Sequence, residues 1–149
     1  MTVIFDIPEK FKKVRDGLRL KLEELSFGML QKSVWISPYH FEEDLKEFLE
    51  NNRLGSYVLV LTTKKLYSDD PRKLAENVWN LKKINMGYSK LLGKLNQLER
   101  KTSGNVKRDL KRIIYKYLTL LESDPLLPME LLPNSWKREK VLKKLKDYS

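Results

Sequence analysis

Apolar residues in the first sixty positions form short runs and two longer stripes. The runs at 2–6, 27–38 and 57–62 are rich in β-branched and other apolar residues, and they predict strands. We interpret the middle run as two short strands or one bent strand. Residues 8–25 and 40–52 carry apolar side chains at steps of three and four, which predicts amphipathic helices. The order strand, helix, two strands, helix, strand predicts the split βαβ, or ferredoxin-like, arrangement.

The predicted strands are apolar at consecutive positions. Val3–Phe5, Val34–Ile36 and Tyr57–Leu61 show none of the alternation of a half-buried strand, a pattern typical of strands that are covered on both faces. In a ferredoxin-like domain both helices cover one face of the sheet. We therefore expect the second face to be covered by a second copy of the chain or by the C-terminal region, and we predict a homodimer.

The pattern changes to helical periodicity after residue 67. Asp70 followed by Pro71 predicts a helix start, with an N-cap residue and a proline at the first helical position. Apolar side chains then recur at steps of three and four across 74–100, which predicts one long helix. A further helix is predicted at 106–122.

A proline-rich segment and a basic helix complete the chain. Prolines within 124–136 prevent a long helix, and the leucines between them predict that the segment packs onto the body of the protein. Ser135 is expected to cap a last helix at 136–147. We therefore predict an α+β protein, with a ferredoxin-like dimerisation domain at 1–67 and a helical, basic C-terminal domain at 68–149.

Positive charge is concentrated in the second part. Residues 1–67 contain 11 Lys and Arg against 10 Asp and Glu, and residues 68–149 contain 19 against 10. Residues 82–116 hold 11 basic residues and two acidic ones. Such a patch is the usual footprint of a polyanion contact, and the alternative is a solvated helix face. The predicted nucleic-acid or phosphate contacts are Lys82, Lys83, Lys90, Lys94, Arg100, Lys101, Lys107, Arg108, Lys111 and Arg112.

Composition excludes several kinds of chemistry. The chain has no cysteine, which removes disulfides, thiol nucleophiles and cysteine-based metal sites. The single histidine, His40, cannot build a zinc site alone and has no partners for a Ser–His pair. No apolar run approaches a membrane span and no signal-peptide pattern is present, so we expect a cytoplasmic protein with no membrane partner. Two tyrosines of the basic stretch, Tyr88 and Tyr117, lie on the apolar stripes and are expected in the core.

Asp6 is the remaining candidate for chemistry, and it has two interpretations. In the first, Asp6 caps the first helix together with Glu9. In the second, a two-fold axis brings two copies of Asp6 together to hold Mg²⁺ or Mn²⁺ and to activate a water for phosphodiester hydrolysis. One carboxylate supplies too few ligands for a firm site, so the metal hypothesis requires the dimer.

Two passages resemble a known family. The first contains Phe5-Asp6-Ile7-Pro8, Arg15, Leu18-Arg19, Phe27-Gly28 and Leu30-Gln31-Lys32-Ser33-Val34-Trp35-Ile36, and the second is SDPLLPMELLPNSW at 123–136. The first resembles the middle domain of PaaX-type transcriptional repressors, the regulators of phenylacetic-acid catabolism. That middle domain is itself similar to the small CRISPR-associated nuclease Cas-two. The second resembles the C-terminal signature of the same repressors.

The resemblance implies a ferredoxin-like dimerising domain, a helical C-terminal domain, DNA-linked repression and release by an aryl-acyl-CoA ligand. It also implies that Asp6 corresponds to the metal-binding aspartate of the nuclease. Such repressors carry a winged helix before the middle domain, whereas this sequence starts at Met1, so we expect either a truncated chain or a shortened relative of the family. A second departure is Lys137 after Trp136, where the family tends to have Pro-Gly.

We therefore expect the core of a PaaX-like transcriptional regulator, a non-enzymatic homodimer that supports DNA binding and senses an acyl-CoA-type ligand. The alternative is a Cas-two-like nuclease dependent on Mg²⁺ or Mn²⁺, or a CRISPR-adaptation scaffold. A third possibility is a structural dimer whose basic face only keeps it in solution.

Overall fold

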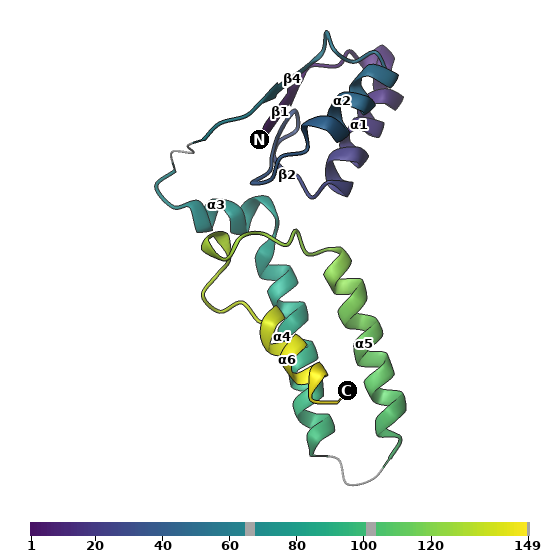
Figure 1. Ribbon diagram of the computed structural model, residues 1–149, viewed down its shortest axis with the longest axis vertical. Coiled ribbons are helices and arrows are strands. Elements are labelled where there is room, and N and C mark those ends of the chain that lie inside the picture. Colours follow the sequence, from purple (N-terminus) through teal and green to yellow (C-terminus); the bar gives the residue numbers. More distant parts are fainter. Residues whose placement is uncertain (65–67, 101–103, 149) are drawn as a thin grey trace. The chain divides into compact units, whose positions relative to one another are not determined.

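The chain folds as an α+β protein, as predicted, with two compact units (Figure 1). The computed structural model describes residues 1–64, 68–100 and 104–148. The units are Met1–Asp69 and Asp70–Ser149. Each unit has its own hydrophobic core.

The first unit is a four-stranded antiparallel sheet with two helices. Its elements are β1 (Thr2–Phe5), the 3₁₀ turn η1 (Glu9–Phe11), α1 (Lys12–Glu24), β2 (Gly28–Gln31), β3 (Val34–Ile36), α2 (Glu42–Asn51) and β4 (Val58–Leu61). The strand order is β2-β3-β1-β4, with antiparallel pairing throughout these strands. This is the ferredoxin-like arrangement that the sequence predicts.

One face of the sheet carries the core of the first unit. Val3 pairs with Trp35 on β3, and both side chains are buried together with Phe5. Leu18 and Leu22 of α1 belong to the same core cluster. Figure 1 shows α1 and α2 side by side over the sheet. The amphipathic helices therefore cover the face that the sequence pattern requires.

The other face of the sheet exposes apolar side chains. Ile4 lies opposite Leu59 on β4 and opposite Val34 on β3, so these residues share that face. The exposed fraction is 36% for Ile4, 54% for Leu59 and 44% for Leu61. The first unit by itself therefore does not cover both faces of the sheet at these positions. We call Ile4, Val34, Leu59 and Leu61 the outer sheet face.

The second unit is helical. Its elements are α3 (Pro71–Val78), α4 (Leu81–Glu99), α5 (Val106–Glu122), the 3₁₀ turn η2 (Met129–Leu131) and α6 (Arg138–Lys146). The buried stripe of α4 is Leu81, Ile84, Tyr88, Leu91, Leu95 and Leu98. Helices α5 and α6 both pack on α4, and α5 runs antiparallel to it (Figure 1). In the described ranges, no helix combines the length and apolar character needed to cross a membrane.

The single helix predicted at 74–100 is wrong, because the chain forms α3 and α4 instead. Asn80 has φ 49°, in the left-handed region, and this residue separates the two helices. Apolar periodicity continues across the break, so the pattern alone does not reveal it. The predicted start is correct: the Asp70 carboxylate accepts a hydrogen bond from the Lys73 backbone N–H at 3.0 Å, and Pro71 is the first helical residue.

The predicted cap of the last helix is also wrong. Helix α6 begins at Arg138 after Lys137, with no side-chain cap. Instead, the Lys137 backbone N–H donates to the Asn85 side-chain oxygen at 2.9 Å. The Asn85 amide nitrogen donates to the Ser135 carbonyl oxygen at 3.2 Å. Hydrogen bonds of Asn85 on α4 therefore fix the start of α6, whereas the sequence predicts a local cap by Ser135.

The proline-rich segment docks on the second unit as predicted. Leu127, Leu132 and Trp136 are buried in its core. The Trp136 ring meets Tyr88 edge to face, with ring centroids 5.7 Å apart. The leucines and the tryptophan thus hold an irregular segment against α4.

Candidate anion-binding interface

A buried carboxylate ties the proline-rich segment to the helices that present the basic residues. Asp124 accepts a hydrogen bond from the Tyr88 hydroxyl at 2.7 Å and one from the Leu126 backbone N–H at 2.9 Å. Arg138 of α6 lies 3.1 Å from the same carboxylate. Burial, and then the hydrogen bond to Asp124, raise the pKa of Tyr88. This group fixes α4, the segment and α6 to one another.

The aromatic and basic residues of α4 and α5 separate as predicted. Tyr88 and Tyr117 are buried in the core, with ring centroids 6.2 Å apart. All the predicted contact residues that the structure describes are exposed: Lys82, Lys83, Lys90, Lys94, Arg100, Lys107, Arg108, Lys111 and Arg112. Lys101 lies outside the described residues.

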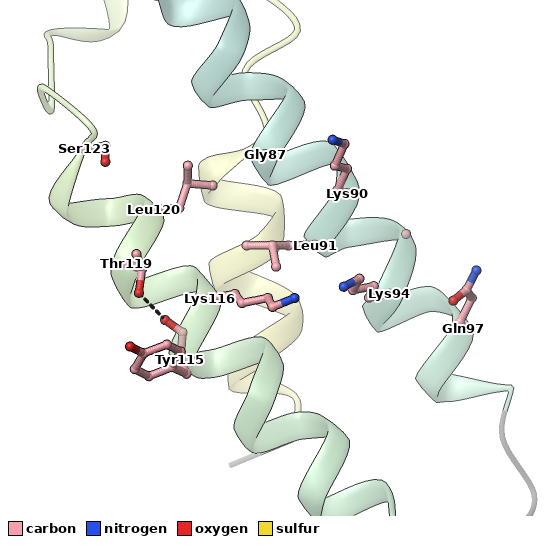
Figure 2. A pocket seen from close by; sticks show the side chains of 11 residues that line it. Gly87, Lys90, Leu91, Lys94, Gln97, Tyr115, Lys116, Thr119, Leu120 and Ser123 are labelled. Atoms are coloured by element: carbon pink, nitrogen blue, oxygen red, sulfur yellow. Dashed lines mark hydrogen bonds between the residues drawn. The ribbon is translucent and has the colours of Figure 1, made fainter.

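Part of this basic surface is hollowed between α4 and α5. A cavity of about 660 Å³ is lined by Lys90 and Lys94 of α4 and by Tyr115, Lys116 and Thr119 of α5 (Figure 2). It shares lining residues with a cavity of about 700 Å³ and with one of about 250 Å³. We call the three together the basic groove. Its cationic residues are Lys82, Lys83, Lys90, Lys94, Arg112 and Lys116.

The structure therefore divides the predicted contacts into two sets. Lys82, Lys83, Lys90, Lys94 and Arg112 line the basic groove. The remaining described ones are exposed but do not line its three cavities: Arg100, Lys107, Arg108 and Lys111. Asp109 contributes a carboxylate to the smallest cavity.

Lys116 lines the groove but is not among the contacts predicted from the sequence. It lies one turn after Arg112, and this i, i+4 spacing places both on the groove side of α5. The spacing was available in the sequence, but the pairing of α5 with α4 that makes it a groove position was not.

Two glycines shape the floor of the groove. A Cβ on Gly87 would lie 2.8 Å from a methyl carbon of Leu120, so the missing side chain lets α5 approach α4 at this point. A Cβ on Gly93 would meet nothing within 4 Å, so this glycine leaves open space. Leu91 and Leu120 supply apolar lining. The groove thus combines an apolar floor with a cationic rim.

Two lysines point toward each other across the groove. Figure 2 shows Lys94 on α4 directed at Lys116 on α5. The pKa of Lys94 is lowered, first by the proximity of the Lys116 amine and the charge repulsion from it, and then by desolvation and by Lys90. An anion placed between the two amines would relieve this repulsion.

The structure contradicts the helix-cap interpretation of Asp6. Neither η1 nor α1 has a side-chain cap, and their N-cap residues are Pro8 and Phe11. Glu9 instead pairs with Arg15 at 2.8 Å. Because η1 intervenes, the first α-helix begins well after Asp6. The carboxylate of Asp6 is exposed just after β1. Among the described residues of one chain, no cluster of three or more carboxylate, histidine or cysteine side chains could hold a metal ion.

Comparisons with known proteins match both units. Residues 1–75 match the family model of the PaaX protein central Cas2-like domain. Residues 79–148 match the model of the PaaX-like protein C-terminal domain. No curated protein matches the chain.

The fold is similar to that of a solved structure. An uncharacterized protein, Rv0674 from Mycobacterium tuberculosis, superposes with a TM-score of 0.69 at 22% sequence identity. The alignment covers 99% of this chain and 57% of that one, so this chain spans little more than half the length of that protein. At this identity the likeness concerns the fold alone.

Proposed function

We propose, from the premise that this chain belongs to the family of PaaX-like proteins, that it forms the core of a transcriptional regulator that contacts DNA through its second unit. The observation that carries the DNA contact is the basic groove, where lysines from two helices converge on one hollow surface. Lysine contacts to phosphate position a protein on DNA without reading its sequence. We therefore expect the module to bind DNA through phosphate contacts that do not read its sequence.

The outer sheet face supports the proposed dimer. Ile4, Leu59 and Leu61 are exposed on a surface that has no covering helix within its unit. A second copy of the chain would bury the same residues on both sides. Two copies would also double the number of phosphate contacts, which strengthens binding to a duplex.

The salt dependence of DNA binding tests the proposal. We compare the wild-type chain with a groove variant, Lys90→Gln with Lys94→Gln, and with a matched variant outside the groove, Arg108→Gln with Lys111→Gln. Each removes two exposed charges. The logarithmic slope of affinity for a DNA duplex against salt should flatten by up to about 0.9 for each lost phosphate contact. Fluorescence anisotropy at several salt concentrations measures it.

The two variants locate the contact. Flattening in the groove variant alone places the phosphates in the groove, and flattening in both extends the contact along α5. Unchanged affinity and slope in both variants would reject a role of the basic surface in DNA binding.

We further propose that an aryl-acyl-CoA ligand releases the DNA, as family membership suggests. Such a ligand should raise the dissociation constant for the duplex at constant salt. CoA alone serves as the control for a simple effect of added negative charge. An effect equal to that of CoA would reject specific release.

A metal-dependent nuclease is the second candidate, favoured by the match to a Cas2-like domain and by the exposed position of Asp6 after β1. It requires two copies of Asp6 to share Mg²⁺ or Mn²⁺. Cleavage of DNA or RNA that needs the metal and disappears in Asp6→Ala, with the dimer intact, would support it. Pure protein that cleaves neither substrate at any concentration of either metal would reject it.

A further inference from the structure

We propose that the basic groove is a binding site for a small amphipathic anion, whose acidic group lies between Lys94 and Lys116 and whose apolar body covers Leu91 and Leu120. We also infer that this anion and DNA exclude each other, because they use the same lysines. The first statement depends only on the groove. The second rests on the proposed function.

The lysine pair is the first argument. Lys94 and Lys116 come from different helices and point at each other, although like charges repel (Figure 2). Lys90 stands one turn away on α4 and adds a third cation to the same wall. A carboxylate, sulfonate or phosphate between the amines would accept charge-assisted hydrogen bonds from both helices. Such a group would convert the repulsion into attraction.

The apolar floor is the second argument, and it distinguishes the ligand from a bare phosphate. A DNA backbone needs cations and no apolar surface, yet this groove has leucines beneath its lysines. The missing side chain of Gly93 leaves open space beside that floor, and the missing side chain of Gly87 lets Leu120 pack against α4 as part of it. The volume of about 660 Å³ lies within the range of small-molecule sites, roughly 300–1,000 Å³. An apolar body with one acidic group is complementary to both features.

Competition with DNA follows from shared contacts. If Lys90 and Lys94 neutralise phosphates of the duplex, a bound anion that already pairs with them removes those contacts. By linkage, DNA must weaken binding of the anion by the same factor. The groove would thus couple a small ligand to release of DNA without any movement of the helices.

Fluorescence titration with 1-anilinonaphthalene-8-sulfonate tests the site. The neutral control is N-phenyl-1-naphthylamine, which has the same rings and no sulfonate. Lys116→Gln removes a groove charge, and Gly93→Leu places a side chain in the open space. The matched controls lie outside the groove on the same helices: Lys111→Gln on α5 and Ser89→Leu on α4. Circular dichroism verifies that each variant is folded.

The groove variants should weaken binding of the anionic probe at least about tenfold, and the two controls should leave it unchanged. The neutral probe should bind at least about tenfold more weakly than the anionic one to the wild-type chain. A probe that binds at the outer sheet face must be distinguished from one that binds in the groove. The titration is therefore repeated in a Leu59→Ser background, where Lys116→Gln should still weaken binding of the anionic probe. Equal binding of both probes, or equal binding by groove and control variants, would overturn the site.

Addition of a DNA duplex separates this inference from the proposed function. The anionic probe should raise the dissociation constant of DNA for the wild-type chain and have no such effect in Gly93→Leu. DNA binding without any groove-dependent probe binding would overturn the site and leave the proposed function standing. Probe binding with no DNA binding would overturn the competition and the proposed function, and the site would stand.

Discussion

A buried carboxylate, Asp124, joins α4, the proline-rich segment and α6 in the second unit. Asp124 is buried and pairs with Arg138 at 3.1 Å, while Tyr88 donates to it. Asp124→Asn removes the negative charge that pairs with Arg138. Removal of one member of a buried pair costs about 3–5 kcal/mol, and we expect the lower end because Arg138 keeps Glu139 at 3.1 Å.

Urea denaturation followed by circular dichroism measures the change. Glu139→Gln is the matched control, since Glu139 is exposed and contacts the same arginine. It should change the free energy of unfolding by less than about 1 kcal/mol. An equal, small effect of both substitutions would show that the buried carboxylate is not needed for stability.

The lysine pair predicts a pH dependence of anion binding. The lowered pKa of Lys94 means that this amine loses its proton at a lower pH than an ordinary lysine does. Affinity for 1-anilinonaphthalene-8-sulfonate should therefore fall as pH rises through that lowered pKa. Lys116→Gln removes the neighbouring amine that lowers the pKa of Lys94, so the fall in affinity should move to higher pH. Titrations between neutral and alkaline pH measure both curves, and superimposable pH profiles would contradict the coupling.

The Lys94–Lys116 pair also predicts the direction in which stability changes with pH. Because the pKa of Lys94 is lower in the folded state than in the unfolded chain, the unfolded chain binds more protons between the two pKa values. Stability should rise with pH through that window as the repulsion is lost. Urea denaturation at a series of pH values should show this rise in the wild-type chain and a smaller one in Lys116→Gln, whereas equal slopes would contradict it.

At single positions, the sequence predicts what depends on periodicity or on short local patterns. Tyr88 and Tyr117 are buried because they lie on apolar stripes, and Asp70 caps its helix because its carboxylate accepts the backbone N–H of Lys73. Asp6 fails as a cap because the chain inserts a 3₁₀ turn before α1, a choice of backbone angles that the residue types do not reveal. Lys116 could not be assigned to the groove from the sequence, because that assignment depends on which face of α5 packs on α4.

Helix packing gives two glycines of α4 opposite roles, although they lie six positions apart in one helix. Alanine at either position gains about 1 kcal/mol of helix propensity. At Gly93 nothing opposes the gain, so Gly93→Ala should stabilise the chain by up to that amount. At Gly87 the added Cβ would lie 2.8 Å and 2.9 Å from the two methyl carbons of Leu120, and that side chain must shift.

We therefore expect Gly87→Ala to be less stable than Gly93→Ala by about 1 kcal/mol or more. Thermal denaturation of the two variants under the same conditions measures the difference. Equal melting temperatures would mean that Leu120 moves at no cost, and that the close approach of α4 and α5 does not depend on Gly87.

Hydrophobic spacing along the sequence does not predict where these helices begin and end. The helix predicted at 74–100 contains the correct apolar positions, and those that lie on α4 are buried. Its break at Asn80 depends on one left-handed residue, a conformation that asparagine tolerates better than most residues but does not require. Likewise, the start of α6 depends on Asn85, which is distant in sequence. Hydrophobic spacing thus predicts the faces of these helices, and tertiary contacts set their ends.

For the whole molecule, the sheet topology followed from the sequence because the order of strands and helices allows few arrangements. The consecutive apolar runs predicted two covered faces, and the structure shows one covered and one exposed in these strands. That difference is informative, since it gives the proposed dimer an apolar surface on the first unit. The groove was beyond sequence reasoning, because its lysines come from two helices whose register is set only by packing.

The outer sheet face predicts the assembly state. If two copies associate through Leu59 and its neighbours, Leu59→Lys would bury an unpaired charge at the interface, which costs several kcal/mol. The dimer dissociation constant should therefore rise at least about a hundredfold. Leu20→Lys is the matched control, because Leu20 is 61% exposed on α1, which packs on the opposite face of the sheet. Sedimentation equilibrium should show a dimer for the wild-type chain and for Leu20→Lys, and a monomer for Leu59→Lys. A wild-type chain that is monomeric at every concentration tested, or a dimer that is unaffected by Leu59→Lys, would contradict this interface.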